Sequence, residues 1–440
     1  MCVTPCEEVC RGRARLARRG FNRRGSGLLP LIMSHPGLPV AICLLAAPFV
    51  AVLQSKAMTP LALIPMAITL ALGWRAGWRP GAPQGAVLSL GLILAGWGGI
   101  TALWAPEPGR AALLAVTLAA MMLLAHGAAG AAQGARLMPW IGFGLVLGLA
   151  AAFADWQSGN ALRAAVRGLK EVPAALMFGL KPAASLMALL LPMAFALPWP
   201  WVARGALLVL GAGILIALPG ETARLATIAG LGAAVLSLAA PRLVPRLVGT
   251  VVALAILTMP LLVGLIPQIP SASLPPSAVH RLVIWDFAAQ RIAERPITGW
   301  GLEASRAMPG GRARPDAATL DRLNIKAPAQ RDFLAVPHVE VMPLHPHNGA
   351  LQLWLELGGI GALIGAALML ALGVAASRSA APAVGAGMLA SAAVTGMLSF
   401  GLWQAWWVAS LLLAMVALAL VPRNHSSQAA SFGGAGETTN

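Results

Sequence analysis

Apolar stretches of about 20 residues recur along most of the chain and are separated by short polar breaks. Inside a bilayer every backbone N–H and C=O group must be satisfied by the protein itself, so such stretches indicate spanning helices. The composition agrees, because 58% of the 440 residues are hydrophobic and only 10% are charged. A water-soluble globular domain of ordinary composition is excluded. We therefore predict an all-α polytopic membrane protein.

The apolar windows predict about twelve transmembrane helices, an even number that places both termini on the same side of the membrane. A long polar loop, residues 267–348, separates the ninth window from the tenth. The windows lie near residues 36–53, 58–74, 86–104, 110–129, 139–155, 173–197, 201–219, 222–240, 246–266, 349–374, 382–402 and 404–421.

The formal net charge is +16, which taken alone would suit a nucleic-acid partner. Its distribution indicates a membrane protein instead, because many arginines lie in the N-terminal segment and in short loops of one side, which the positive-inside rule assigns to the cytoplasm. We predict no nucleic-acid partner, whereas the basic residues 11–24 fit anionic membrane lipids. The loop arginines are Arg75, Arg79, Arg136, Arg242, Arg246, Arg378 and Arg423.

The predicted organisation has five segments, with the long loop outside the cytoplasm. Met33 is an alternative start to Met1. The segments are a basic cytoplasmic N-terminal segment (1–35), transmembrane helices 1–9 (36–266), a periplasmic loop that contains short helices (267–348), transmembrane helices 10–12 (349–421) and a disordered cytoplasmic tail (422–440).

Inside the loop, residues 280–301 carry apolar side chains at three- and four-residue spacing, which predicts a helix lying along the membrane surface. Residues 306–333 are rich in Pro, Gly and charge, which predicts an irregular connection. Tyrosine is absent, so tryptophans at the span ends are expected to form the interfacial belt. These are Trp74, Trp104, Trp156, Trp201, Trp403, Trp406 and Trp407.

Several polar residues stand in a fixed order around this loop: Arg281, Trp285 four residues on, a Pro-x-x-Gly-x-Gly turn at 296–301, and the His347–Asn348 pair opening a helix that continues to Glu356 and Gly358. The combination resembles the O-antigen ligase and O-antigen polymerase family of bacterial inner-membrane glycosyltransferases. The resemblance implies transfer of a glycan from undecaprenyl diphosphate at the periplasmic face, without a metal or other cofactor. It implies as acceptor a lipid A core sugar for a ligase, or a second lipid-linked glycan for a polymerase.

Two arginines are predicted to hold the leaving diphosphate. Negative charge grows on that group as the glycosidic bond breaks, and a guanidinium binds phosphate oxygens bidentately without losing its proton. Arg281 opens the helix of the outer loop, and Arg224 lies at the outer end of a hairpin between two spans. Arg224 also matches a family arginine near the start of a span, although Ala223 stands where the family usually has serine.

His347 is the predicted catalytic base. A neutral imidazole can take the proton of an acceptor hydroxyl, and a place at a helix start disfavours the imidazolium. Asn348 is predicted to cap the helix or to bind a sugar. The alternative for His347 is a capping residue at the membrane interface without a catalytic role.

Three further residues are predicted to bind substrate. Asn348, Gln352 and Glu356 are spaced by four and form one polar stripe on the helix. Their alternative role is a hydrogen bond between packed helices. Lys181 is expected well inside its span, before Pro182, where it could bind the lipid phosphate. The family usually has asparagine-type residues in that region, so Lys181 departs from its pattern.

Three alternatives to a metal-free transferase remain open. His338, Glu340, His345 and His347 have the chemistry of a zinc site. A polytopic transporter would explain Lys181 and Glu356, but it predicts ionisable residues near mid-membrane and short outer loops. A structural scaffold for envelope assembly would leave the outer polar residues replaceable.

Overall fold

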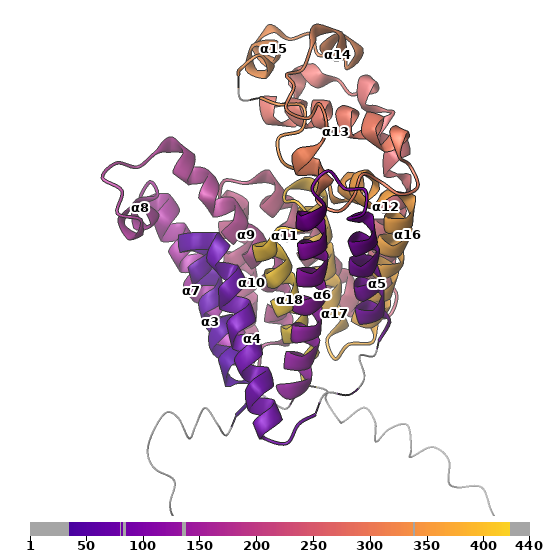
Figure 1. The fold of residues 1–440 in the computed structure, drawn as a ribbon. Coiled ribbons are helices and arrows are strands. Elements are labelled where there is room, and N and C mark those ends of the chain that lie inside the picture. Colours follow the sequence, from indigo (N-terminus) through magenta and orange to yellow (C-terminus); the bar gives the residue numbers. More distant parts are fainter. Residues whose placement is uncertain (1–34, 80, 82–84, 134–137, 338, 423–440) are drawn as a thin grey trace, which may run out of the picture.

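The computed structural model describes residues 35–422 except residues 80, 82–84, 134–137 and 338. The predicted cytoplasmic segment and tail thus lie almost wholly outside the described residues. Within them the chain forms only α-helices, short 3-10 helices, turns and bends, and no strand. The predicted all-α class is therefore confirmed, with a bundle of long helices and a smaller lobe at one end of it (Figure 1).

Each of the twelve apolar windows contains a helix of the bundle. The segment of α9 is helical throughout but begins and ends as 3-10 helix, η2 (Ala174–Gly179) and η3 (Leu191–Ala196). The bundle helices are α3 (Leu38–Gln54), α4 (Met58–Arg75), α5 (Ala86–Thr101), α6 (Pro108–Ala131), α7 (Met138–Gln157), α9 (Leu180–Leu190), α10 (Trp201–Ala217), α11 (Glu221–Ala239), α12 (Val244–Val263), α16 (Gly349–Ser377), α17 (Pro382–Leu398) and α18 (Ala405–Ala419).

Seven helical segments among the described residues are long and apolar enough to cross a membrane. One of them, Leu38–Arg75, contains both α3 and α4, which are joined by the short 3-10 helix η1 (Ser55–Ala57). Four shorter apolar helices, α5, α10, α17 and α18, have 15 to 17 residues. The number of about twelve spans is therefore not confirmed.

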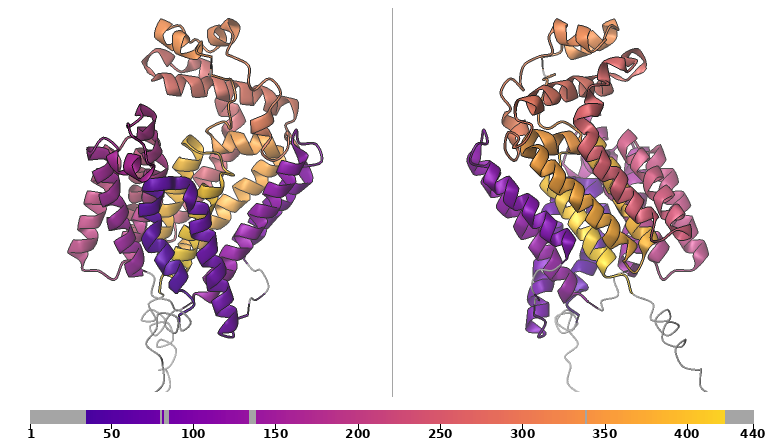
Figure 2. Two further views of the ribbon diagram at one scale, coloured as in Figure 1. Left: turned by 60° about the vertical axis from the view of Figure 1, so that its left-hand side comes forward. Right: turned by 90° about the vertical axis from the view of Figure 1, so that its right-hand side faces the viewer.

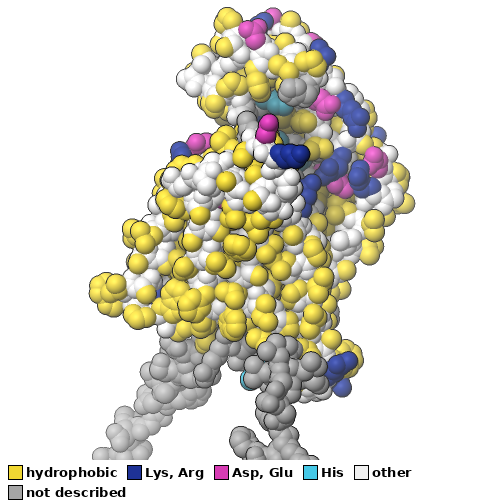
Figure 3. Space-filling model, turned by 90° about the vertical axis from the view of Figure 1, so that its left-hand side faces the viewer, with side chains coloured by type: hydrophobic (Ala, Val, Ile, Leu, Met, Phe, Trp, Pro, Cys, Tyr) yellow, Lys and Arg dark blue, Asp and Glu magenta, His cyan; other side chains and the backbone are white. Residues whose placement is uncertain are grey.

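The outside of the bundle is apolar, as a lipid-facing surface must be. One face shows a broad band of hydrophobic side chains, with charged side chains gathered toward its two ends (Figure 3). In the interior, small residues let helices approach closely: Ser391 on α17 donates to the carbonyl oxygens of Ala226 and Ala188 at 2.9 and 3.0 Å. Helix α9 is almost wholly buried beyond its first turn, so it lies at the centre of the bundle.

The predicted tryptophan belt is only partly right. Trp74 and Trp201 are 52% and 77% exposed, as the belt requires. Trp407 is only 1% exposed, and Trp406 is buried beside it with the two rings 5.7 Å apart. Position near a span end therefore does not decide which tryptophans face lipid, because packing against neighbouring helices competes with it.

A buried ion pair fixes the loop after α7. Arg163, on the short helix α8 (Ala161–Val166), donates to Asp155 on α7 at 2.6 Å, and both side chains are fully buried. The guanidinium also donates to the carbonyl oxygen of Leu176 at 2.6 Å and to Asn160 at 2.5 Å. The pair therefore ties α8 to the segment that leads into α9.

The lobe, residues 264–348, has a hydrophobic core of its own and lies at one end of the bundle in every view (Figures 1 and 2). Its helices are α13 (Pro276–Glu294), α14 (Ala317–Arg322) and α15 (Pro328–Leu334), with 3-10 helices η4 (Ile266–Gln268), η5 (Ser271–Ser273) and η6 (Ala304–Ala307). Residues 306–333 were expected to be irregular, which is only partly right: they include α14 and most of α15, and Leu320, Leu323 and Ile325 are buried there.

Helix α13 lies between the lobe core and α16. Val279, Val283 and Ala288 of α13 are fully buried, and the same core includes Leu351 and Leu355 of α16. The apolar face of α13 is therefore covered by protein, which differs from the expected position along a membrane surface. A helix whose apolar face has a protein partner places its polar side chains reproducibly.

Candidate functional site

Helix α16 is broken near its start, and the Pro-x-x-Gly-x-Gly turn fills the break. Gly358 has φ 65° and ψ −167°, a conformation that interrupts the helical ladder. Gly359 N–H donates to the carbonyl oxygen of Pro296 at 2.8 Å instead of to Leu355. In return, the carbonyl oxygen of Leu355 accepts from Trp300 N–H at 2.9 Å, and that of Glu356 from Gly301 N–H at 2.8 Å. The turn and the Glu-x-Gly motif thus form one structural unit.

We expect Gly358→Ala to destabilise the protein by about 1–3 kcal/mol or more. A β-carbon at Gly358 would overlap the carbonyl oxygen of Ile297, and the positive φ strains any L side chain. Thermal unfolding in detergent measures the loss. Gly213→Ala on α10 is the matched control, because nothing lies within 4 Å of its β-carbon position and alanine favours a helix. Equal melting of the two variants would contradict the importance of the break.

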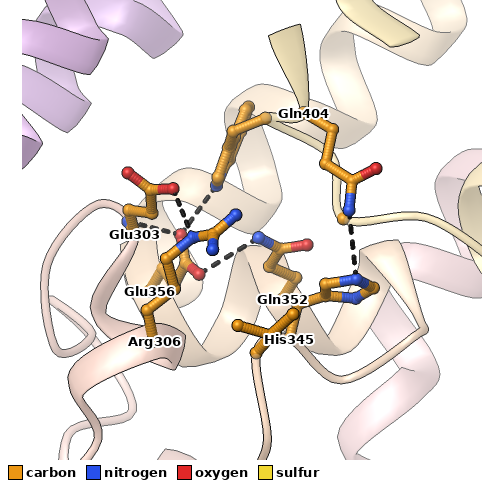
Figure 4. Close-up of a pocket in the computed structure, with 9 residues that line it drawn as sticks. Glu303, Arg306, His345, Gln352, Glu356 and Gln404 are labelled. Carbon is orange, nitrogen blue, oxygen red and sulfur yellow. Dashed lines mark hydrogen bonds and ion pairs between the residues drawn. The ribbon is translucent and has the colours of Figure 1, made fainter. Parts of the chain in front are cut away.

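The Glu356 carboxylate is fully buried at this break and accepts four hydrogen bonds. The donors come from three parts of the chain: Ser305 Oγ at 2.5 Å and Glu303 N–H at 2.6 Å in the lobe, Trp403 Nε1 at 2.7 Å after α17, and Gln352 Nε2 at 3.1 Å on α16. Glu356 therefore joins the lobe to the bundle through one buried group. The close-up in Figure 4 shows Glu303, Gln352 and Glu356 of this network together with Arg306 and His345.

The loop between α17 and α18, residues 399–404, is held by the same helix. Gln352 Oε1 accepts from Leu402 N–H at 2.9 Å, and Trp403 donates to Glu356 as described. Gln404 Nε2 lies 3.3 Å from Nε2 of the buried His345 (Figure 4). Three consecutive residues of the loop are thus fastened to residues 345–356.

His347 uses the first residue of this loop as its partner. Its Nδ1 lies 2.6 Å from the carbonyl oxygen of Ser399, and because a carbonyl only accepts, Nδ1 carries the proton and Nε2 keeps its lone pair. The residue has φ 53°, an uncommon conformation for a non-glycine. Burial lowers the pKa of His347, and the charges of Arg281 and Lys181 lower it further, although the bond to Ser399 opposes them. The imidazole is therefore neutral near pH 7.

Two neighbours of His347 have structural contacts. Asn348 is the N-cap of α16: its Oδ1 accepts from Leu351 N–H at 3.1 Å, and the side chain is buried. His345 lies with its ring centre 4.2 Å from that of His347. Burial, followed by the neighbouring charges, lowers the pKa of His345 to about 3, so that His345 is neutral as well.

Trp285 explains why an arginine and a tryptophan are spaced by four on α13. The Trp285 indole donates to the carbonyl oxygen of Pro346 at 2.8 Å, directly before His347. Arg281 lies one turn earlier on the same helix and is therefore held beside the histidine. Arg281 is half-buried, and burial lowers its pKa without any carboxylate acting against that effect. Among the described residues, Arg281 has no ion-pair partner.

Lys181 lies within the apolar helical segment Ala175–Ala196, which is long enough to cross a membrane, and its depth in the bilayer stays a prediction. Residues 174–179 form the 3-10 helix η2, so Lys181 is the second residue of α9. Its ammonium lies 4.5 Å from the ring centre of Phe178, and its stem lies against Gly220. The positive charges of Lys181 and Arg281 act on each other, so both cations stand at the same end of the bundle.

Arg224 lies in the first turn of α11, as the hairpin reading predicted. Its Nε donates to the carbonyl oxygen of Ile216 at 2.9 Å, and it pairs with Glu221 at 3.2 Å. The side chain is 38% exposed. The first turn of α11 also contacts the end of α17, directly before Ser399, because Thr222 Oγ1 donates to the carbonyl oxygen of Leu398 at 3.3 Å. Figure 3 shows Lys, Arg and His side chains gathered where the surface is hollowed between the lobe and the bundle.

Of the predicted zinc ligands, His338 lies outside the described residues. His345 and His347 are neighbours, whereas the backbone carbonyl of Glu340 meets His280 Nε2 at 2.7 Å. In the described part of the chain no three His, Cys, Asp or Glu side chains gather in a way that could hold a metal ion.

Sequence reasoning missed Ser305, Glu303, Trp403 and Gln404 as parts of this site. Glu303 carried one signal, since it stands two residues after the Gly-Trp-Gly turn, and the structure gives it φ 61° with Arg306 at 2.6 Å. Trp403 and Gln404 carried none, because they lie about fifty residues beyond the motif, at the end of an ordinary apolar window.

The family model described as O-antigen ligase matches residues 204–365. A Rickettsia conorii protein named "Putative polysaccharide ligase" is 33% identical over 149 residues, which cover 33% of this chain and 32% of that protein. A Rickettsia prowazekii protein of the same name is 33% identical over 155 residues, 33% of each chain. The matches thus span about a third of these relatives' length. No solved structure matches. Residues 204–365, which carry Arg224, Arg281 and the His347 turn, therefore match the O-antigen ligase family.

Proposed function

We propose that this protein transfers a glycan from undecaprenyl diphosphate to a lipid A core sugar at the periplasmic face of the bacterial inner membrane. The observation that carries the proposal is the half-buried Arg281, which has no acidic partner among the described residues and stands beside a neutral His347. An uncompensated, partly desolvated cation is costly unless an anion completes the site. A diphosphate is such an anion, and the family match supports it as the donor's leaving group.

The residues divide the reaction between them. Arg281, Arg224 and Lys181 hold the diphosphate of the donor at the hollow between lobe and bundle. His347 Nε2 takes the proton of an acceptor hydroxyl, and the acceptor oxygen attacks the anomeric carbon as the bond from that carbon to the diphosphate oxygen breaks. Undecaprenyl diphosphate leaves with the bonding electron pair. Ser399 carbonyl then stabilises the imidazolium through Nδ1–H.

Polymerisation of lipid-linked repeat units is the alternative within the same chemistry, since both reactions use one donor class and one base. A transporter is less well supported, because the break in α16 is filled by hydrogen bonds from residues 296–301. The proposal has no resident metal or other cofactor.

The test uses the purified full chain in detergent with an undecaprenyl-diphosphate-linked glycan. One arm supplies lipid A with its core sugars, a second arm supplies more lipid-linked glycan, and both are repeated with excess EDTA. Glycan-capped lipid A, separated on a gel, is the expected product, with EDTA having no effect. Longer lipid-linked chains in the second arm alone would identify a polymerase, and activity lost to EDTA and restored by zinc would replace the base with a metal. No product in either arm would overturn the proposal.

The proposal also requires the lobe to lie in the periplasm. In a chain whose own four cysteines are serine, Ala318→Cys on α14 should react with a membrane-impermeant maleimide in intact spheroplasts. Ala76→Cys, in the turn after α4, should react only after the membrane is opened, and both positions are exposed. The reverse pattern would place the whole site in the cytoplasm, away from the proposed acceptor.

A further inference from the structure

We propose that Gln352, Glu356 and Trp403 are positioning residues, which set the tautomer of His347 by holding the carbonyl oxygen of Ser399 in place. The inference rests on the proposed role of His347 as the base. It differs from the sequence-based expectation that Gln352 and Glu356 bind substrate. It also gives a role to the loop 399–404, which lies outside the segment that matches the family.

The base needs one particular tautomer. In neutral imidazole one nitrogen carries the proton and the other accepts, so His347 can use Nε2 as a base only if Nδ1 is the protonated nitrogen. The 2.6 Å contact from Nδ1 to Ser399 oxygen enforces this, since the backbone oxygen has no proton to give. If that oxygen moved away, the proton could occupy Nε2, and the base would be lost.

The local backbone fixes only the N–H of Ser399, which donates to the carbonyl oxygen of Thr395 at 3.0 Å, and leaves the orientation of its carbonyl group to other contacts. Helix α17 ends at Leu398, and Ser399 has φ −137° and ψ −76°, outside the helical region. The loop that follows is instead fixed by side chains of residues 345–356, through Leu402 N–H to Gln352 and Trp403 Nε1 to Glu356. Glu356 and Gln352 therefore hold the loop 399–404, and the loop in turn holds the carbonyl oxygen that accepts from His347.

The same bonds leave little capacity for a substrate. Glu356 is fully buried and its two oxygens accept four hydrogen bonds, while the Gln352 amide uses its oxygen for Leu402 and its nitrogen for Glu356. Gln352 is only 4% exposed. A residue with its polar atoms occupied and no exposed surface acts through its partners.

Two variants remove the bonds with little change of volume. Gln352→Met deletes both amide bonds, and Trp403→Phe deletes only the indole N–H to Glu356. Trp97→Phe is the matched control: it deletes an indole N–H that donates to the carbonyl oxygen of Leu357 at 2.9 Å, beside the same helix break but without a link to the loop.

The first readout is the ¹⁵N spectrum of histidine-labelled full-length protein at pH 7.5, with His347 assigned by its absence in His347→Ala. We expect Nδ1–H for His347 in the wild type and in Trp97→Phe, and a mixture containing Nε2–H in both test variants. A pure Nδ1–H signal in variants that melt like the wild type would overturn the inference. Two variants are tested, so the inference can still be judged if one of them fails to fold. The readout needs no substrate, so it does not depend on whether the protein is a ligase.

The second readout separates positioning from substrate binding in the transfer assay. A positioning role predicts that kcat falls by about tenfold or more, while the KM values for the donor and the acceptor are unchanged. The expected fall is part of the roughly 10²–10⁴-fold rate increase that a general base supplies. A raised KM with unchanged kcat would return Gln352 and Glu356 to substrate binding. If the wild type makes no transfer product while the tautomer responds as expected, the proposed function fails and the positioning of His347 stands.

Discussion

Replacing His347 with alanine is expected to reduce glycan transfer by about 10²–10⁴-fold, the usual contribution of a general base. The acceptor hydroxyl must lose its proton as it attacks, and the neighbouring His345 is a much weaker base, because burial lowers its pKa to about 3. The donor should still bind, since its diphosphate contacts the arginines. Transfer and donor binding, measured on the same purified sample, check both statements.

His126→Ala is the control for this substitution, because His126 is an exposed histidine on α6 within the bundle. Alanine variants of His338, Glu340 and His345 extend the test to the metal alternative. If the losses in those three equalled the loss at His347, a shared coordination shell would be the better explanation. Normal transfer by His347→Ala would leave the histidine as a structural residue.

The pH profile gives the same residue a second test. His347 works as a base only when it is unprotonated, and burial together with Arg281 and Lys181 lowers its pKa below the usual value of about 6.5. The midpoint of the acid limb of transfer should therefore lie below the pH of about 6.5 at which an ordinary histidine would place it. Lys181→Met removes one positive charge, so the pKa of His347 should rise and the acid limb should move to higher pH.

The helices of the bundle could be predicted from the sequence because burial in lipid leaves a local signal. Every apolar window contains a helix. A segment of about twenty residues carries both the apolar side chains that face lipid and the helical hydrogen bonds that satisfy its own backbone, so the signal is local. The sequence did not reveal that Lys181 follows a stretch of 3-10 helix, η2, because hydropathy does not register the type of helix.

The site was predictable only where one short segment carries it. Arg281 and His347 stood in recognisable motifs, and the structure brings them together through the bond from Trp285 to Pro346. The hydrogen-bond partner of His347 is the backbone carbonyl oxygen of Ser399, about fifty residues away. No side-chain pattern can mark a backbone oxygen. The filled break at Gly358 likewise depends on a pairing of two distant segments, which periodicity within either one does not reveal.

The other large effect is expected at Arg281. Arg281→Gln should lower kcat by about 10²–10³-fold, the usual cost of removing one group that stabilises charge in the transition state. Arg281→Lys should fall between that variant and the wild type, because an ammonium keeps the charge but loses the bidentate fork. Arg322→Lys is the matched control: it changes another lobe arginine, which is half exposed and already paired with Asp286 at 2.6 Å.

The position of Arg281 should matter as much as its charge. Trp285→Phe leaves the guanidinium intact but deletes the indole bond to Pro346, which is the bond that joins α13 to the residue before His347. We expect this variant to lose transfer with Arg281 present, and Arg281→Gln to cost much less in the Trp285→Phe background than in the wild type, because residues that act as one unit are not additive. Double-mutant kinetics with Arg224→Lys, which lies on α11 and should add independently, complete the cycle. Fully additive losses at Arg281 and Trp285 would show that the tryptophan does not act through the arginine.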